Sequence, residues 1–167
     1  MPIPDLSHLK NRESLIITMV CYGNICRSPM AAAVLHNKVS NIQRPVITVD
    51  SAGTSNWHVG QGPNPPSLRT WEKAGYKYKH VASHFDYSRL VTADLVLVMD
   101  EHNHQEVSKF VTSNEEEAKI FYLREFDTSN PASLFVPDPY SLPDSAFEEV
   151  LEMVERATDG LVEALLR

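Results

Sequence analysis

Four short runs of apolar and β-branched residues divide the chain, and the segments between them have helical character. We predict one strand in each run: Leu15–Val20, Val46–Val49, Leu95–Met99 and Lys119–Leu123. Strands buried on both faces read as continuous apolar runs, and strands that alternate with helices form parallel sheets. The sequence therefore predicts an α/β fold, a single domain in which helices cover both faces of an open parallel four-stranded sheet.

The predicted helices fill much of the remaining chain. The clearest is the last, where apolar residues recur at steps of three and four residues. Pro143 and the pair Asp144-Ser145 predict its start, and Gly75 predicts the end of the second helix. The expected helices are Pro29–Ser40, Pro66–Ala74, Asp86–Ala93, Asp100–Phe110 and Asp144–Arg167.

Length and composition restrict the class of protein. The 167 residues suit one domain, and we expect residues 1–12 to be a flexible extension before a domain of residues 13–167. A net charge of −7 argues against nucleic-acid binding, and the apolar runs are too short to span a membrane. The N-terminus has no signal pattern and the two cysteines form no disulfide framework, so a cytoplasmic location is expected. The oligomeric state is not predicted.

The segment Cys21–Pro29, directly after the first strand, has the features of a phosphate-binding loop. In open parallel sheets, ligands bind at the carboxyl ends of the strands. Gly23 and Asn24 tolerate a positive φ, so that successive backbone N–H groups can point at an anion. Ser28-Pro29 reads as the N-cap and first residue of a helix, whose dipole adds to this attraction.

Two side chains of this loop suggest chemistry. A helix N-terminus, inward amides and Arg27 are surroundings that lower the pKa of a cysteine, which makes Cys21 a candidate nucleophile. Arg27 can hold two phosphoryl oxygens with its planar fork, and Ser28 can donate a hydrogen bond to the cysteine sulfur. The plainer alternative is that Cys21 is a small core residue. A zinc site would need a second ligand pair, which the sequence lacks at zinc spacing.

The wider pattern resembles a known family. The string Val20-Cys21-x-Gly23-Asn24-Ile25-Cys26-Arg27-Ser28-Pro29-Met30-Ala31 is similar to the signature of the low-molecular-weight protein tyrosine phosphatases. Further matches follow in order at Asp50-Ser51-Ala52-Gly53-Thr54-Ser55, Met99-Asp100 and Asp138-Pro139-Tyr140.

The resemblance implies a flavodoxin-like phosphotyrosine phosphatase I fold and an enzyme that hydrolyses phosphotyrosine and aryl phosphates through a cysteinyl-phosphate intermediate. It implies no metal and no cofactor, and a phosphotyrosine protein or peptide as the partner. The implied phosphate-binding residues are Tyr22, Gly23, Asn24, Ile25, Cys26 and Ser28, beside the catalytic Cys21 and Arg27.

Expulsion of a tyrosine oxygen needs a proton donor, and two carboxylic acids qualify. Asp100 follows the third strand and so lies at the same sheet edge, whereas Asp138 stands between two prolines in the loop segment Asp127–Pro143. The residues alone leave both open, because an Asp-Pro pair is commonly just a turn. The resemblance implies that Asp138 is the general acid and that Asp100 is a structural partner.

The resemblance also assigns supporting and pocket residues. It implies that Ser51 and His80 hydrogen-bond with Asn24 and hold the loop, with His84 as the alternative to His80; Ser83 stands where the family usually has Arg. A slot for a flat aromatic ring is expected from Tyr22, Ile25, Trp57 and Tyr140, with His58 beside it. Trp57 packed in the core is the alternative. Tyr22 and Ser141 depart from the residues common in the family.

Two other functions compete with this interpretation. Arsenate reductase uses the same fold and loop, but its thioredoxin-coupled form needs further cysteines, and none follows Cys26. An inactive phosphotyrosine-binding module would be expected to have lost Cys21, Arg27 or Asp138. We also expect that mild oxidation joins Cys21 and Cys26 in a disulfide, unless Cys26 is only a packing residue.

Overall fold

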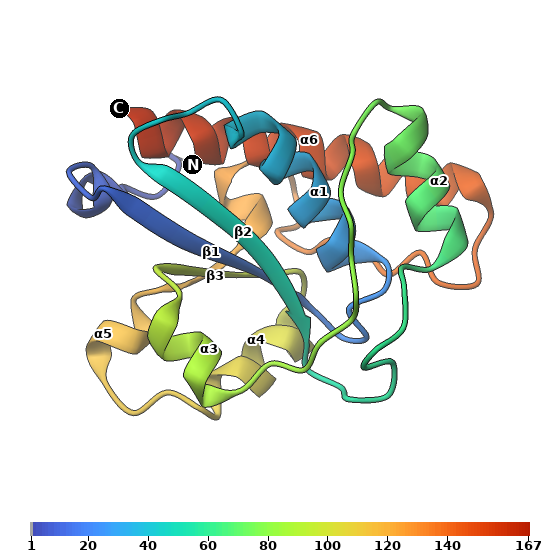
Figure 1. The fold of residues 1–167 in the computed structure, drawn as a ribbon, viewed down its shortest axis with the longest axis horizontal. Helices are drawn as coiled ribbons and strands as arrows, with labels where there is room; N and C mark the ends of the chain where they lie inside the picture. Colours follow the sequence, from blue (N-terminus) through green and yellow to red (C-terminus); the bar gives the residue numbers. More distant parts are fainter. Residues whose placement is uncertain (1) are drawn as a thin grey trace.

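The computed structural model describes residues 2–167, which form a parallel four-stranded sheet between two layers of helices (Figure 1). The strand order is β2-β1-β3-β4, and every pairing is parallel. The strands are β1 (Ser14–Cys21), β2 (Val46–Gly53), β3 (Leu95–Val98) and β4 (Ile120–Tyr122). The predicted fold class is therefore confirmed.

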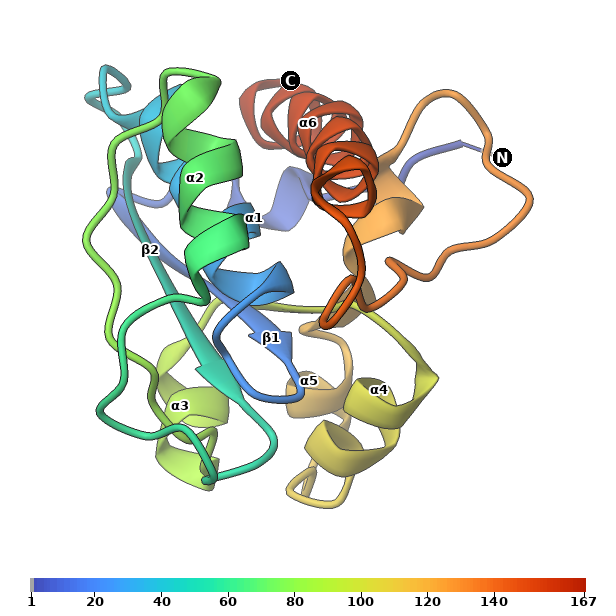
Figure 2. The same cartoon turned by 90° about the vertical axis from the view of Figure 1, so that its right-hand side faces the viewer.

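Helices lie on both faces of the sheet, as Figure 2 shows: α1, α2 and α6 cover one face, and α3, α4 and α5 lie on the other. They are α1 (Arg27–Val39), α2 (Pro65–Lys73), α3 (Tyr87–Thr92), α4 (Glu101–Ser108), α5 (Asn114–Glu117) and α6 (Asp144–Leu166). Two short 3₁₀ helices, η1 (Ser7–Leu9) and η2 (Leu123–Phe126), complete the list. The sequence did not predict α5, because four residues are too few for a helical period.

The two layers have separate cores because the side chains of β1 alternate between the faces. Ile17 and Met19 belong to the larger core, under α1 and α6, whereas Val20 belongs to the smaller one with Val98. Each of these side chains is fully buried, and such burial contributes about 1.5–3 kcal/mol per side chain. The central position of β1 therefore places the loop that follows it on a rigid support.

The segment before β1 differs from the expected loose extension. Leu6 and Leu9 are only 2% and 3% exposed and belong to the larger core. Leu6 is the N-cap and Leu9 the last residue of the 3₁₀ helix η1, which packs against α6, and their spacing of three residues brings both leucines onto the same side. The sequence did not indicate this burial, because Leu6 and Leu9 are separated by polar residues and form no continuous apolar run.

The end of α2 and the start of α6 lie where the sequence predicts them, whereas the predicted side-chain caps of α1 and α6 are absent. Gly75 has a φ of +95° just after α2, as the predicted helix end requires. Helix α1 begins at Arg27 with Cys26 as its N-cap, so Ser28 is not the cap that its type suggested. Helix α6 begins at Asp144 after Pro143, without any side-chain cap. No helix of residues 2–167 has the length and apolar character to cross a bilayer.

Candidate active site

The loop between β1 and α1 is built around Asn24. This residue has a φ of 56° and is fully buried. Its side-chain amide donates to Ser28 Oγ at 2.7 Å and to Ser51 Oγ at 2.9 Å, while its Oδ1 accepts from the Ser83 backbone N–H at 2.9 Å. Asparagine is among the few residues that tolerate this left-handed conformation, and here its own side chain holds the turn in place.

The sulfur of Cys21 lies at the bottom of this loop. Cys21 is 2% exposed, and its Sγ lies 2.9 Å from Ser28 Oγ. Since Ser28 Oγ already accepts a hydrogen bond from Asn24, its own proton is free to point at the sulfur. The structure therefore explains why Ser28 does not cap α1: its hydroxyl faces the cysteine instead.

Arg27 is buried behind the loop and is held by two partners. Its Nη1 donates to Asp100 Oδ2 at 2.7 Å and to the Val136 carbonyl at 3.1 Å, and its Nη2 lies 3.9 Å from Asp138 Oδ2. Burial lowers the pKa of Arg27, but the charges of Cys21 and Asp100 and the Asp100 hydrogen bond outweigh it and raise that pKa overall. The guanidinium is therefore a fixed positive charge beside the sulfur.

The two candidate acids have different surroundings. Asp100 is occupied at both oxygens, because its Oδ1 accepts from the Asn103 backbone N–H and so caps α4, while Oδ2 binds Arg27. Asp138 is half exposed and lines the same cavity as Cys21; its Oδ1 accepts from the Tyr140 N–H at 3.1 Å. Of the two, only Asp138 faces the cavity.

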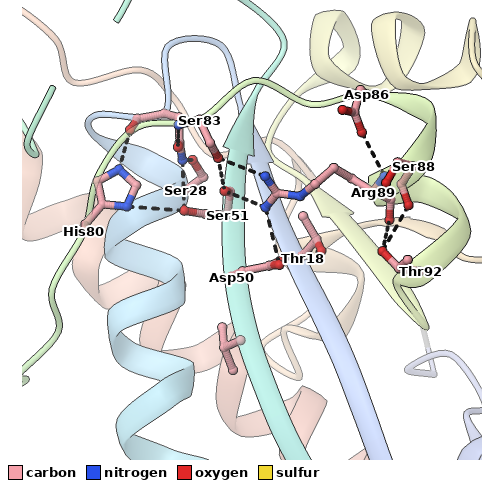
Figure 3. Close-up of polar contacts among 12 residues, drawn as sticks. Thr18, Ser28, Asp50, Ser51, His80, Ser83, Asp86, Ser88, Arg89 and Thr92 are labelled. Carbon is pink, nitrogen blue, oxygen red and sulfur yellow. Dashed lines mark hydrogen bonds and ion pairs between the residues drawn. The ribbon is translucent and has the colours of Figure 1, made fainter. Parts of the chain in front are cut away.

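His80 lies against the loop, whereas His84 does not. His80 Nε2 is 2.6 Å from the Asn24 carbonyl and must donate to it, which leaves the Nδ1 lone pair toward Ser51 Oγ at 3.5 Å (Figure 3). His84 instead contacts the Thr54 carbonyl. Burial lowers the pKa of His80, and the Asn24 hydrogen bond only partly offsets this. A neutral ring therefore fits the observed contacts.

A cavity of about 400 Å³ opens above the sulfur. It is lined by ten residues, all of them expected from the sequence: Cys21, Tyr22, Gly23, Ile25, Cys26, Arg27, Trp57, His58, Asp138 and Tyr140. The three aromatic residues around its mouth, Tyr22, Trp57 and Tyr140, are 46%, 77% and 52% exposed. Trp57 is therefore not a core residue, and the aromatic faces are free to contact a ligand.

Gly23 and Cys26 occupy positions that suit this cavity. A Cβ on Gly23 would lie 3.0 Å from His58 Cδ2, so glycine allows the loop and His58 to approach each other. Cys26 is buried, and burial together with the nearby Cys21 charge raises its pKa to about 12. Cys26 therefore stays a neutral thiol beside the site.

Two residues at the site were not predicted from the sequence as contributors. Ser83 donates its backbone N–H to Asn24, and Arg89 reaches Ser83 from α3. Ser83 follows His80 by three residues, and that proximity was the only available signal. Arg89 lies in a short helix without any motif, so nothing in the sequence pointed to it.

Comparisons with known proteins agree with this geometry. The family model described as low molecular weight phosphotyrosine protein phosphatase matches residues 16–167. A low molecular weight protein-tyrosine-phosphatase of Streptomyces coelicolor is 38% identical over 151 residues, which cover 89% of this chain and 92% of that protein.

Solved structures give the same result. A protein tyrosine phosphatase from Entamoeba histolytica with Hepes in its active site superposes with a TM-score of 0.84 at 30% identity, covering 90% of this chain and 96% of that one. An arginine phosphatase from Geobacillus stearothermophilus superposes with a TM-score of 0.77 at 28% identity, covering 90% and 92%. The resemblance seen in the sequence is thereby confirmed, and the chain belongs to the low molecular weight phosphotyrosine protein phosphatase family.

Proposed function

We propose that this protein tyrosine phosphatase works through Cys21 as nucleophile, Arg27 as phosphate clamp and Asp138 as general acid and base. The observation that carries the proposal is the convergence of these three side chains on one cavity, two from the loop between β1 and α1 and one from the loop before α6. A sulfur, a buried guanidinium and an accessible carboxyl group are the set that phosphoryl transfer through a covalent intermediate requires.

In the first step, the Cys21 thiolate attacks phosphorus, and a sulfur–phosphorus bond forms as the bond to the tyrosine oxygen breaks. Asp138 gives its proton to that oxygen, which leaves as a neutral phenol. Arg27 donates to the phosphoryl oxygens and stabilises their charge in the transition state. Asp100 and the Val136 carbonyl hold the Nη1 side of the guanidinium, which leaves the Nη2 side toward the cavity.

In the second step, water attacks the phosphorus of the cysteinyl phosphate. Asp138, now a carboxylate, takes the proton of this water, and the sulfur–phosphorus bond breaks to release inorganic phosphate. The Ser28 hydroxyl donates a hydrogen bond to the departing sulfur and stabilises its negative charge, for which the 2.9 Å distance between Ser28 Oγ and Cys21 Sγ is suitable. The enzyme then returns to its starting state with a thiolate at Cys21.

The aromatic residues at the mouth favour an aryl phosphate over phosphoarginine, the substrate class in the name of one structural neighbour. Tyr22, Trp57 and Tyr140 offer flat faces on which a phenyl ring can stack. A guanidinium group would need a carboxylate partner, and Asp138 is the only carboxylate among the cavity residues. We expect a phosphotyrosine peptide to be hydrolysed at least about 10²-fold faster than a matched phosphoarginine peptide.

The replacement Cys21→Ser tests the mechanism. It should abolish turnover of a phosphotyrosine peptide and of p-nitrophenyl phosphate, yet leave binding of inorganic phosphate measurable, because a hydroxyl of similar shape is a far weaker nucleophile. Wild-type enzyme quenched during turnover should carry one phosphate on Cys21, seen by mass spectrometry. Full activity in the serine variant would contradict the proposal.

The same assays separate the two competing functions. The chain has no cysteine beyond Cys21 and Cys26, so a thioredoxin-coupled arsenate reductase would have no third thiol with which to pass on a disulfide. Arsenate reduction without phosphatase activity would favour the reductase. Phosphotyrosine binding without turnover would favour the inactive module.

We also propose that reversible oxidation regulates the site. Peroxide oxidises the Cys21 thiolate to a sulfenic acid and is reduced to water; the Cys26 thiol then attacks that sulfur, forming a disulfide and releasing a second water. Both cysteines are free and lie on the same short loop. Peroxide-treated wild type should recover activity with dithiothreitol, whereas Cys26→Ser should over-oxidise irreversibly. Equal recovery of both proteins would leave Cys26 a packing residue.

We also propose a cytoplasmic location, because a reducing compartment keeps a nucleophilic thiol such as that of Cys21 in its active form.

A further inference from the structure

Arg89 makes an unusually complete set of contacts at the end of β2. Its Nη2 donates to the Ser51 carbonyl at 2.9 Å and lies 3.4 Å from Asp50 Oδ2, while its Nη1 donates to Ser83 Oγ at 2.9 Å (Figure 3). The Ser83 hydroxyl in turn donates to the same Ser51 carbonyl at 2.9 Å. The guanidinium therefore closes a ring of hydrogen bonds with Ser51 and Ser83.

Both ends of this arginine are fixed. Asp86 caps α3 by accepting from the Arg89 backbone N–H at 2.9 Å, so the helix start sets the position of the backbone. Asp50, which faces the guanidinium, is itself held by the Thr18 hydroxyl of β1 at 2.6 Å. The Arg89 side chain is 23% exposed, and its partners belong to β2 and to the segment that leads into α3.

A continuous path of hydrogen bonds leads from this ring to the nucleophile. Ser83 donates its backbone N–H to Asn24 Oδ1, which fixes the orientation of the Asn24 amide. That amide donates to Ser51 Oγ and Ser28 Oγ, and Ser28 Oγ contacts the Cys21 sulfur. Every link is 3.0 Å or shorter, and Asn24 and Ser28 are fully buried.

We propose that Arg89 is a positioning residue for the phosphate loop, acting through Ser83 and Ser51 on Asn24. The proposal rests on the proposed role of Cys21, because it concerns the accuracy with which Ser28 and the sulfur are placed. The ion pair between Arg89 and Asp50 is partly exposed and by itself contributes little to the free energy of folding. The two hydrogen bonds of the planar fork are the important contacts, because they fix the spacing of two chain segments that both hold Asn24.

His80 also supports Asn24, independently of Arg89. His80 donates to the Asn24 backbone carbonyl, whereas the ring built on Arg89 controls the Asn24 side chain. Loss of Arg89 should therefore leave the left-handed backbone of Asn24 in place and loosen only the side-chain amide. Phosphate binding by the loop backbone should change little, and the chemical step should suffer.

The test replaces Arg89 by Gln and by Lys. For Arg89→Gln we expect kcat for p-nitrophenyl phosphate to fall about 10- to 100-fold, the scale of a small misplacement in an active site, with KM and the Kd of inorganic phosphate changed less than about 3-fold. Arg89→Lys keeps the charge but cannot make both bonds of the fork, so it should recover only part of kcat.

A double-mutant cycle separates positioning from general loss of stability. Ser83→Ala removes the hydroxyl that Arg89 uses, so its effect on kcat should be strongly non-additive with that of Arg89→Gln. The matched control is Lys38→Gln, which removes an ammonium that ties α1 to Thr158 and Asp159 of α6 on the other face of the sheet. The Lys38→Gln variant should be less stable than wild type but have an unchanged kcat. In the double variant with Arg89→Gln, the effects of the two replacements on kcat and on stability should be additive.

The outcomes are distinguishable from a failure of the mechanism itself. If wild type accumulates no cysteinyl phosphate, the proposed function is wrong, whatever the Arg89 variants do. If wild type does accumulate the cysteinyl phosphate, but folded Arg89→Gln has a kcat within about 2-fold of the wild-type value, the positioning role is wrong. Additive effects of Arg89→Gln and Ser83→Ala would also overturn it, and Ser83→Ala alone reports on the path if Arg89→Gln does not fold.

Discussion

Two of the loops that line the cavity, the one after β1 and the one before α6, are built in opposite ways. In the loop after β1, the residues Asn24, Arg27 and Ser28 are 3% exposed or less, and the side chain of each makes hydrogen bonds to fixed partners. In the loop before α6, Asp138 is half exposed and Tyr140 is 52% exposed. The first loop is held in one shape by buried hydrogen bonds, whereas the second presents Asp138 and Tyr140 to solvent.

The exposed loop is nevertheless fastened at a few points. Val136, fully buried two residues before Asp138, donates its N–H to the Met99 carbonyl at 2.7 Å and accepts from Arg27. At its start, the buried Asp127 binds Arg156 of α6. The loop is thus held at its base, and Arg27, the proposed phosphate clamp, also holds the segment that carries Asp138, the proposed acid.

The comparison has a functional meaning. Phosphate is common to all substrates of the class, so its binding loop gains from being rigid before the substrate arrives. The leaving group differs between substrates and must enter and depart, so its proton donor and aromatic contacts suit an open edge. Variants in the two loops should therefore differ in how their effects depend on the substrate.

Among the variants that test this difference between the loops, Asp138→Ala should have the largest effect. Loss of a positioned acid should slow kcat for phenyl phosphate about 10²- to 10⁴-fold, and the loss should be smaller for p-nitrophenyl phosphate, whose leaving group needs little protonation. A series of aryl phosphates measures this as a steeper dependence of log kcat on leaving-group pKa. The control is Asp144→Ala, which removes a nearby exposed carboxylate paired with Arg69. An equal loss across all leaving groups would mean that Asp138 is structural.

In contrast to Asp138→Ala, Arg27→Lys should slow all substrates to the same extent. An ammonium group cannot make two parallel bonds to phosphoryl oxygens or keep the contacts with Asp100 and Val136, so kcat should fall about 10²- to 10³-fold. The loss should be the same for every leaving group, and the affinity for inorganic phosphate should also fall. Near-normal turnover in the lysine variant would remove Arg27 from the catalytic set.

Gly160→Ala should weaken the base of the exposed loop without touching the cavity. A Cβ at this position of α6 would lie only 1.7 Å from the Phe126 carbonyl oxygen, so η2 or α6 must move. We expect a loss of about 3 kcal/mol in the free energy of unfolding, at the upper end of ordinary overpacking. Chemical denaturation measures it. Gly62→Ala is the control, because a Cβ there meets no atom within 4 Å.

The sequence predicted the sheet and the first loop well, because both are local in the chain. A buried strand followed by Gly23, Asn24 and Ser28 carries its geometry within a few residues, and the apolar runs of the strands need no knowledge of distant contacts. Family resemblance then located Asp138, which residue type alone did not separate from Asp100. The structure shows the physical difference: Asp100 has both oxygens occupied, whereas Asp138 faces the cavity.

What the sequence missed depends on contacts between distant segments. Arg89 reaches Ser51 across 38 positions, and nothing in the motif around either residue indicates that contact. The burial of Leu6 and Leu9 depends on α6, at the other end of the chain. Ser28 was misread as a helix cap because its type fits that role, whereas its contacts with Asn24 and Cys21 exist only in the folded loop.

The smallest expected effect concerns Asp127, which anchors the start of the exposed loop. Its side chain is fully buried; burial raises the pKa of this carboxyl group, but hydrogen bonds from Ser129 and the charges of Arg156 and Arg124 outweigh it and lower that pKa overall. The folded state therefore binds fewer protons than the unfolded one as pH falls past the unfolded pKa of about 3.9. The stability that Asp127 contributes is fully present above that pH and is lost as pH falls through the lower, folded pKa.

Asp127→Asn should accordingly reduce the free energy of unfolding by about 1.5 kcal/mol at pH 7, the scale of a charge-assisted hydrogen bond. The difference from wild type should shrink below about pH 4, because the carboxyl group of the unfolded chain is protonated there and the stability from the folded carboxylate is lost as pH falls through the lower, folded pKa. Urea denaturation at pH 7, 5 and 3 measures this, with Asp159→Asn as the control, whose exposed pair with Lys38 should matter by less than about 0.5 kcal/mol. Because the loop is also held at Val136, kcat at pH 7 should stay within about 2-fold of wild type. A constant stability difference from pH 7 to pH 3 would show that Asp127 acts by packing rather than by its charge.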